Sequence, residues 1–321
     1  MKDVIGSVAV IAIGRNEGDR LRQCLQSIPD GLTKIYVDSQ STDDSVAFAR
    51  GSGVVVVELD MSSPFTAARA RNAGFLELER LAPDTDYVQF VDGDCEFEPG
   101  WIETARRFLD ANPAIAVVCG RRRERFAGAS VYNQLCDAEW NTPVGQAQAC
   151  GGDAMMRVTA LRAVGAYDSA VVAGEEPEMC ARIRATGAQI WRLAEPMTIH
   201  DAAIYRIAQW WRRAVRGGFG YAQVWRLRGL YAAEVKRAVF WAGALPLSAV
   251  ILTLSFSPWW LLLFGAPVLQ VARIALRGGG DRFAWQQAFF LVLAKWPELQ
   301  GILRYARQAK DARPAPPAAY K

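Results

Sequence analysis

The fold class of this chain is decided by the stretch Tyr87-Val88-Gln89-Phe90-Val91-Asp92-Gly93-Asp94, in which an apolar run leads into two carboxylates. A short and nearly continuous apolar run is typical of a strand in a parallel sheet, because helices cover both faces of such a sheet. Asp92 and Asp94 would then stand at the carboxyl end of the strand, which is the edge where open α/β sheets bind ligands. Gly93 allows a sharp turn between them.

Strand and helix patterns alternate on both sides of this stretch. Further strands are predicted at residues 8–13, 35–37, 54–57 and 115–119, and helical patterns lie between them at 21–28, after residue 43, at 65–81 and at 99–109. This spacing predicts right-handed βαβ units. The predicted fold class is therefore α/β, a Rossmann-like, mostly parallel sheet with helices on both faces. The first strand is not followed by Gly-x-Gly-x-x-Gly, which disfavours a dinucleotide-binding fold.

Residues 121–200 are less regular. We expect loops at 151–152 and 174–178, a helix at 178–186 and a strand at 189–193. The six cysteines form no Cys-x-x-Cys pair and the chain has a single histidine, so a zinc finger is disfavoured.

Two carboxylates one residue apart can bind a hard divalent cation. Mg²⁺ and Mn²⁺ prefer oxygen ligands, and they commonly bind one or two carboxylates together with substrate phosphates. Such an ion would neutralise a diphosphate leaving group. An isolated Asp-Gly-Asp can also be a surface turn, but its position after an apolar strand favours a ligand site.

The charge pattern changes in the last third of the chain. Residues 205–237 contain eight Arg or Lys against the single acidic residue Glu234, and no charged residue follows over the 35 positions 238–272. Basic helices with Trp and Phe on the opposite face fit a membrane interface, although they could also pack on the α/β domain. A spanning helix needs about 20 apolar residues, so a helical hairpin turning near 257–260 is expected. Basic flanks usually mark the cytoplasmic side.

These patterns predict four parts. They are an α/β domain (1–202), basic amphipathic interface helices (203–237), a membrane-associated helical region (238–310, with a hairpin at 238–272 and an apolar helix at 283–294) and a disordered tail (311–321). No signal peptide is recognised before the first strand. We therefore expect a protein of the inner membrane whose α/β domain faces the cytoplasm. Nucleic acid is not an expected partner, because the basic block adjoins the uncharged run.

Six motifs in order resemble the family 2 glycosyltransferases of the GT-A fold, over roughly the first 200 residues. They are Val10-Ile11-Ala12-Ile13-Gly14-Arg15-Asn16-Glu17, Val37-Asp38-Ser39-Gln40-Ser41-Thr42-Asp43-Asp44, Ala70-Arg71-Asn72-Ala73-Gly74, Phe90-Val91-Asp92-Gly93-Asp94, Gly151-Gly152-Asp153 and Gly174-Glu175-Glu176-Pro177-Glu178-Met179-Cys180-Ala181-Arg182.

The resemblance implies an inverting glycosyltransferase that moves a sugar from a nucleotide sugar, UDP being the expected nucleotide, to a lipid-linked or saccharide acceptor at the membrane, in cell-surface polysaccharide or glycolipid synthesis. It implies Glu176 as the catalytic base, with Glu175 as a possible substitute. The implied donor-binding residues are Arg15, Asn16, Glu17, Asp38, Arg71, Asn72, Asp92 and Gly93. The implied ligands of Mg²⁺ or Mn²⁺ are Asp94, Asp92 and His200, although a lone histidine can equally be structural.

The acceptor side is expected to include Gly151, Gly152, Asp153, Gln209, Trp211 and Arg212. Gln209 and Arg212 match the Gln-x-x-Arg-Trp motif of membrane-bound polysaccharide synthases, but Arg213 replaces the final Trp. This departure disfavours processive synthesis, and a basic helix touching lipid is the alternative.

The chemistry needed for inverting transfer agrees with this site, because a base must deprotonate the acceptor hydroxyl while a cation stabilises the departing phosphate. Two other functions remain open from the sequence. A polyprenyl-phosphate glycosyltransferase would use a phosphate acceptor and need little base catalysis. A non-catalytic, membrane-bound nucleotide-sugar scaffold would need no base at all.

Overall fold

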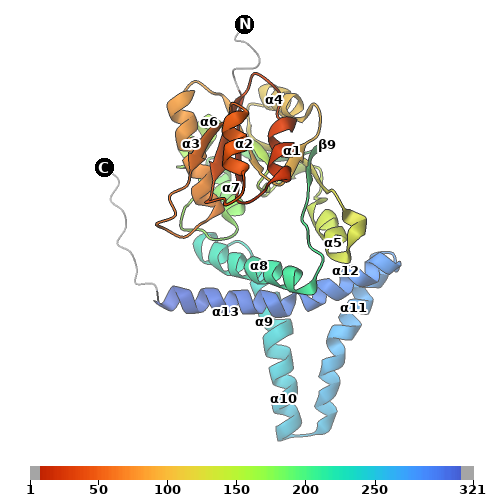
Figure 1. Cartoon of the computed structure of the whole chain (residues 1–321). Coiled ribbons are helices and arrows are strands. Elements are labelled where there is room, and N and C mark those ends of the chain that lie inside the picture. The colour runs from red at the N-terminus through yellow and green to blue at the C-terminus, as the bar shows by residue number, and fades with distance from the viewer. Residues whose placement is uncertain (1–7, 312–321) are drawn as a thin grey trace. The chain divides into compact units, whose positions relative to one another are not determined.

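The computed structural model describes residues 8–311, which divide into two compact units at Ile204 and Tyr205 (Figure 1). The boundary lies two residues beyond the end expected for the α/β domain. The described part of the first unit contains one nine-stranded sheet with the order β3-β2-β1-β4-β8-β6-β9-β5, and β7 pairs with β9.

The four parallel strands of this sheet are those predicted from the apolar runs. They are β1 (Val8–Gly14), β2 (Thr33–Asp38), β3 (Val55–Glu58) and β4 (Tyr87–Asp92). Helices α1 (Asp19–Ser27), α2 (Ser45–Gly51), α3 (Ala67–Leu81) and α4 (Trp101–Ala111) connect or follow them. The register places Ile13 of β1 beside both Val37 and Asp92, so these strands end at one edge.

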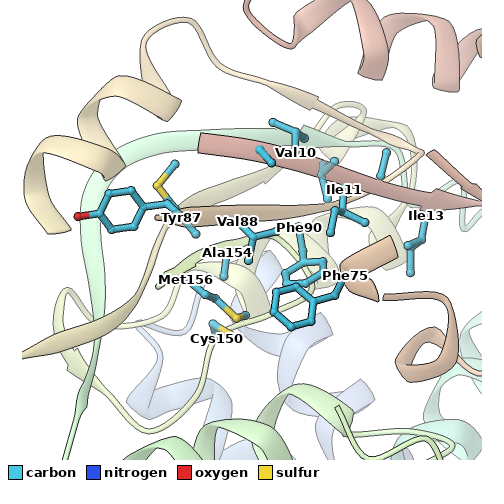
Figure 2. Close-up of a cluster of buried hydrophobic side chains, with 14 of the residues drawn as sticks. Val10, Ile11, Ile13, Phe75, Tyr87, Val88, Phe90, Cys150, Ala154 and Met156 are labelled. Atoms are coloured by element: carbon cyan, nitrogen blue, oxygen red, sulfur yellow. The ribbon is translucent and has the colours of Figure 1, made fainter. Parts of the chain in front are cut away.

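The core lies between β1, β4 and helix α3. Figure 2 shows Ile11, Val88 and Phe90 close to Phe75 of α3, and all four side chains are buried. Gly74 brings α3 close to the sheet, because a Cβ there would lie 2.9 Å from Val37 Cγ2. The fit between α3 and the sheet positions the N-terminal part of this helix, and Arg71 with it, near the carboxyl ends of the strands.

The second half of the sheet is mixed rather than parallel. It consists of β5 (Cys95–Phe97), β6 (Ile115–Glu124), β7 (Gly145–Ala147), β8 (Ala154–Arg157) and β9 (Gln189–His200). Strand β8 runs antiparallel between β4 and β6, whereas β6 and β9 are parallel. The expected strands 115–119 and 189–193 are therefore too short. The ladder between β6 and β9 continues through register shifts into polar residues that carry no apolar pattern.

Three helices and one 3₁₀ turn complete this unit: η1 (Ala127–Ala129), α5 (Val131–Trp140), α6 (Val158–Ala163) and α7 (Glu175–Ala185). Helix α7 begins at Glu175, three residues before the expected start, so the segment expected to be a loop is helical. Pro177 does not prevent this, because a proline in the first helical turn removes no intrahelical hydrogen bond. Gly174 precedes the helix with a φ of 83°.

The second unit is helical. It consists of α8 (Ile207–Arg228), α9 (Ala232–Val239), the π turn η2 (Phe240–Ala244), α10 (Leu245–Ser255), the 3₁₀ segment η3 (Pro258–Gly265), α11 (Ala266–Arg277), α12 (Arg282–Leu293) and α13 (Lys295–Asp311). Gly218 of α8 and Gly301 of α13 permit a close crossing, because a Cβ on either residue would clash with the backbone of the other helix. Except for Asp311, which ends α13, the expected tail 311–321 lies outside the described residues.

Two continuous helices in this unit are long and apolar enough to cross a membrane, judged by length and composition. They cover Ala232–Ser255, with 24 residues, and Pro258–Arg277, with 20 residues. In Figure 1, α10 and α11 form the two arms of a hairpin. Within the unit their apolar side chains are largely exposed, for example Leu254 at 82% and Trp259 at 78%. The uncharged run, expected to be a hairpin, therefore forms helices without a covering layer of protein in the described residues.

Candidate active site

Asp92 and Asp94, at the end of β4, contact different neighbours. Strand β4 ends at Asp92, and the Gly93 amide donates a hydrogen bond to the Ile13 carbonyl at 2.8 Å. A Cβ at Gly93 would lie 3.2 Å from that carbonyl oxygen and 3.2 Å from Glu17 Cγ. The tight turn therefore holds the end of β4 against β1 and allows Asp92 and Asp94 to have different neighbours.

Asp92 faces two arginines. Its Oδ1 lies 2.9 Å from Arg71 Nη2, and its Oδ2 lies 3.7 Å from Arg122 Nη2. Its amide nitrogen lies 3.4 Å from the Asp153 carboxylate. Burial raises the pKa of Asp92, and the charge of Arg71 opposes this effect without cancelling it. Because its carboxylate is paired with guanidinium groups, Asp92 is a structural partner of Arg71 as well as a candidate ligand.

Asp94 faces the only histidine of the chain. Strands β5 and β9 bring them together, since Cys95 pairs in register with His200, and Asp94 Oδ2 lies 3.4 Å from His200 Nε2. Burial raises the pKa of Asp94, but the hydrogen bond and charge of His200 outweigh burial and lower it. Burial lowers the pKa of His200, but the neighbouring carboxylates of Asp94 and Glu124 outweigh burial and raise it to about 9.

The donor atoms around Asp94 fit a divalent cation. Two ligand atoms that share one octahedral ion at about 2.1 Å lie roughly 3 Å apart, which is close to the separation of Asp94 and His200. Asp94, Cys95 and His200 form one group of possible ligands among the described residues, and Asp92, Cys95 and Asp153 form a neighbouring one. The predicted ligands Asp94 and His200 thus lie together, while Asp92 belongs to the adjacent group.

The two predicted base candidates lie in the first turn of α7. Arg71 Nη1 lies 3.0 Å from Glu175 Oε1 and 3.2 Å from Glu176 Oε1. The side chain of Glu175 is 5% exposed and that of Glu176 is 17% exposed, so Glu176 is the more accessible of the two. Burial and then the charge of Glu175 raise the pKa of Glu176 to about 7, against the opposing charge of Arg71. A carboxyl group with this pKa can accept a proton near neutral pH.

The loop after β1 is tied to the loop after β2. The Asn16 amide nitrogen donates to Ser41 Oγ at 2.8 Å, and Asn16 Oδ1 accepts from the Thr42 amide at 2.7 Å. Asp38 is buried, and its two oxygens accept from Tyr36 Oη at 3.0 Å and from the Ser41 amide at 2.8 Å. These contacts join the two loops at the carboxyl edge of the sheet. Contact of Asn16 and Asp38 with a nucleotide stays a prediction.

Arg15 and Glu17 flank this junction in different environments. Arg15 is exposed at the loop. Glu17 lies 2.7 Å from Arg20, and its pKa is raised to about 7 by burial and then by the charge of Asp94. Its side chain lies against the turn at the end of β4, since a Cβ at Gly93 would be 3.2 Å from Glu17 Cγ, and contact of Arg15 and Glu17 with a nucleotide stays a prediction.

Asn72 connects α3 to the segment before α7. Its Nδ2 donates to the Tyr167 carbonyl at 2.7 Å and to Ser169 Oγ at 3.1 Å, and its Oδ1 accepts from the Tyr167 amide at 3.0 Å. Both side-chain groups of Asn72 therefore hold protein backbone, which supports a positioning role beside Arg71.

Gly151, Gly152 and Asp153 lie next to the arginines that pair with Asp92. A Cβ at Gly152 would clash with Arg71 Nη2 and lie 2.9 Å from Asp92 Oδ2, whereas one at Gly151 would meet only Arg122 Nη2, at 3.9 Å. Asp153 is buried and accepts a hydrogen bond from Thr198 Oγ1 at 2.6 Å. Gly152 is thus required by the close approach of the Arg71–Asp92 pair.

Arg122, Glu124 and Trp140 were missed from the sequence. Arg122 Nη2 lies 2.7 Å from Asp153 Oδ1, and its guanidinium stands over the Trp140 ring at 5.4 Å. The signal available was the basic triplet at 121–123, directly after a predicted strand. Its polar character suggested a loop, so the continuation of β6 into the site was not foreseen.

Gln209, Trp211 and Arg212 belong to the second unit. Gln209 Oε1 accepts from the backbone amides of Tyr205 and Arg206, at 3.0 and 2.9 Å, and so caps the start of α8. Trp211 Nε1 donates to Gln300 Oε1 at 3.0 Å, and Arg212 is exposed. These contacts are structural, and an acceptor-binding role for the three residues stays a prediction.

Comparisons with known proteins show which family and fold the chain resembles. Residues 7–161 match the model of the family described as "Glycosyl transferase family 2". The chain is 27% identical over 211 residues to the pre-mycofactocin glycosyltransferase of Mycobacterium tuberculosis, an alignment that covers 60% of this chain and 42% of that protein. It is 29% identical over 141 residues to a TPR repeat-containing protein of Synechococcus elongatus, covering 43% and 33%. The chain thus spans less than half the length of these relatives.

Two solved structures share the architecture. The mannosyltransferase PcManGT from Pyrobaculum calidifontis, in complex with GDP-Man and Mn²⁺, superposes with a TM-score of 0.63 at 19% identity, covering 92% of this chain and 87% of that one. GalNAc-T7 with UDP, GalNAc and Mn²⁺ superposes with a TM-score of 0.54 at 16% identity, covering 76% and 52%. These similarities confirm the predicted GT-A fold.

Proposed function

Because the chain belongs to the family 2 glycosyltransferases, we propose that it transfers a sugar from a nucleotide sugar to an acceptor hydroxyl with inversion, using Glu176 as the base. The observation that carries the proposal is the position of Glu176. Of the two α7 carboxylates that contact the buried Arg71, it is the more accessible, and the same Arg71 contacts Asp92 at the end of β4. The guanidinium group of Arg71 thus contacts both the proposed base, Glu176, and the candidate metal ligand Asp92.

The environment of Glu176 suits proton transfer from a hydroxyl. A general base is most effective when its pKa lies near the working pH, and the pKa of Glu176 is raised to about 7, chiefly by burial. Arg71 contacts Glu176 Oε1 at 3.2 Å and so orients the carboxylate. Glu175 is more deeply buried, and we assign it the supporting role of raising the pKa of its neighbour.

Asp94 and His200 are proposed to hold a divalent cation, Mg²⁺ or Mn²⁺, with Asp92 nearby. Their separation and their oxygen and nitrogen donors fit such an ion. When bound, the ion would stabilise the negative charge of a departing diphosphate. The presence of Mn²⁺ in the complexes of PcManGT and GalNAc-T7 supports this assignment.

The donor is proposed to lie along the carboxyl edge of β1, β2 and β4. The joined loops at Arg15–Glu17 and Asp38 would take the nucleotide, because ligands bind at this edge in open α/β sheets. The two solved relatives carry GDP-Man and UDP. We propose a UDP-sugar as the first donor to test, and Gly151–Asp153 as part of the acceptor side.

The second unit is proposed to attach the enzyme to the inner membrane, with the first unit in the cytoplasm. The helices Ala232–Ser255 and Pro258–Arg277 have the required length and expose their apolar side chains. Exposed basic residues of α8, such as Arg212 and Arg216, would interact with anionic head groups. An acceptor at the membrane then fits polysaccharide or glycolipid synthesis. Full-length protein that stays soluble without detergent would contradict this attachment.

The enzymatic proposal is tested with purified full-length protein in detergent. Release of nucleoside diphosphate is measured from a panel of UDP- and GDP-sugars, with Mn²⁺, with Mg²⁺ and with EDTA. We expect turnover of at least one donor, its loss in EDTA, and its loss in Asp94→Ala. A protein that binds and hydrolyses no donor under any condition would favour a non-catalytic scaffold instead.

A further inference from the structure

The side chain of Glu124 lies at the second ring nitrogen of His200. Glu124 ends β6 and pairs in register with His200 of β9. Its Oε2 lies 3.8 Å from His200 Nδ1, while Asp94 Oδ2 lies 3.4 Å from His200 Nε2. The imidazole therefore stands between two carboxylates, one in the candidate metal site and one behind it.

The carboxylate of Glu124 is fixed in place. Its side chain is fully buried. Its Oε1 accepts hydrogen bonds from the Phe126 amide at 3.1 Å and from Asn133 Nδ2 at 3.2 Å, and its Oε2 accepts from the Ala202 amide at 2.9 Å. A carboxylate can accept about four hydrogen bonds. The three donors named above use three of these positions and hold the carboxylate in place. Oε2, which faces His200, accepts only one of the three bonds and can accept another.

The Nδ1 atom of His200 is the matching donor. It is buried and has no hydrogen-bond partner among the described residues. A buried polar group without a partner is costly, and its distance to Glu124 exceeds a normal hydrogen bond by less than about 1 Å. The ring also lies edge-on to Trp140, with centroids 4.7 Å apart and planes at 73°. The His200 ring is therefore packed against Trp140, and a small rotation of the ring would bring Nδ1 within hydrogen-bond distance of Glu124.

We propose that Glu124 is a positioning residue of the metal site, which accepts a hydrogen bond from His200 Nδ1–H and so directs the lone pair of Nε2 toward the cation that Asp94 would also bind. The inference rests on the proposed function, since it takes Asp94 and His200 as ligands. Metal-bound histidines generally donate their other ring N–H to a carboxylate, carbonyl or water, and loss of that partner weakens metal binding about 10–100-fold.

The single histidine of the chain makes the contact directly observable. Full-length protein is labelled with ¹⁵N-histidine, and the Nδ1–H signal of His200 is recorded without metal. Affinity for Mn²⁺ alone is measured in parallel from the electron paramagnetic resonance of the free ion. The variants are Glu124→Gln and the matched control Asn133→Ala, which loses a hydrogen bond to Glu124 without touching His200.

Glu124→Gln is expected to shift the Nδ1–H signal and to weaken Mn²⁺ binding about 10–100-fold. The glutamine amide must turn its N–H₂ group either toward the donors at Oε1, which are the Phe126 amide and Asn133, or toward those at Oε2, which are the Ala202 amide and His200. Asn133→Ala should destabilise the same corner of the fold but keep the wild-type Nδ1–H signal and Mn²⁺ affinity.

Three results would overturn the inference, and they are separable. An unchanged Nδ1–H signal and affinity in Glu124→Gln removes the positioning role and leaves the proposed function standing. Equal weakening of Mn²⁺ binding in Asn133→Ala reduces Glu124 to scaffolding. A wild-type protein that binds no Mn²⁺ refutes the metal site of the proposed function itself, before any variant is compared.

Discussion

Arg71 Nη1 lies 3.2 Å from Glu176 Oε1, and the Arg71 side chain is only 2% exposed. The same guanidinium contacts Glu175 and Asp92 at 3.0 and 2.9 Å. A buried cation with three carboxylate neighbours is both a structural element and an electrostatic one, because it compensates charges that α3, β4 and α7 bring together. The proposed base and the carboxyl end of β4 are therefore expected to respond together when Arg71 is changed.

Replacing Arg71 should destabilise the first unit as well as the reaction. Arg71→Gln leaves buried carboxylates without their cation, and the loss of one partner from a buried ion pair costs about 3–5 kcal/mol. Arg80→Gln is the control on the same helix, because Arg80 pairs with Glu77 at the surface and such pairs contribute about 1 kcal/mol or less. Thermal unfolding of the two variants should differ clearly, and equal midpoints would contradict the account.

The rate of sugar transfer should rise with pH through about 7. Glu176 must be deprotonated to act as a base, and burial followed by the charge of Glu175 raises its pKa to about 7. Below that pH the active form is lost, so kcat/KM, which reports the pKa values of the free enzyme, should fall about tenfold for each further pH unit. A kcat/KM profile between pH 5.5 and 8.5 tests this, and a flat profile would argue against Glu176 as the base.

Neutralising Glu175 should move this profile to lower pH. The negative charge of Glu175 raises the pKa of Glu176, so Glu175→Gln lowers that pKa and shifts the acid limb below its wild-type midpoint. Activity at pH 8 should persist. Loss of activity at every pH, with donor affinity retained, would instead assign the base role to Glu175.

The neighbouring glycines provide a matched pair. Gly152→Ala forces a Cβ into the Arg71–Asp92 pair, whereas Gly151→Ala adds one at ordinary contact distance from Arg122. Overpacking of this kind costs about 1–3 kcal/mol, so Gly152→Ala should lower both the unfolding midpoint and kcat. Gly151→Ala should keep the wild-type unfolding midpoint, because its added Cβ meets no atom closer than ordinary contact distance. The reverse order would show that the glycine contacts are wrongly assigned.

The parallel half of the fold was predictable because its strands are short apolar runs. Residues 8–13 and 87–91 are buried, and every position in them is apolar except Gln89. Asp94, Arg71 and Glu176 could be singled out from the motifs, and the structure brings Arg71 and Glu176 into contact, while the catalytic and ligand roles stay predictions.

The mixed half could not be predicted in this way. Strand β8 enters between β4 and β6 through long-range pairing, and β6 continues into Arg121–Glu124 through a register shift. Polar residues in such a strand carry no period-2 pattern, so Arg122 and Glu124 looked like loop residues. Helix α7 was placed three residues late because residues 174–178 were expected to form a loop, although a first helical turn tolerates Pro177.

The central claim, that Glu176 deprotonates an acceptor hydroxyl in this enzyme, is tested most directly by Glu176→Gln. The measurement compares kcat for sugar transfer with the affinity for the nucleotide sugar in Mn²⁺, using the donor found in the panel. We expect a fall in kcat of about 10²–10⁴-fold, which is the usual contribution of a general base, with donor affinity unchanged. A variant that transfers sugar at the wild-type rate would contradict it and would favour an acceptor, such as a phosphate, that needs no base.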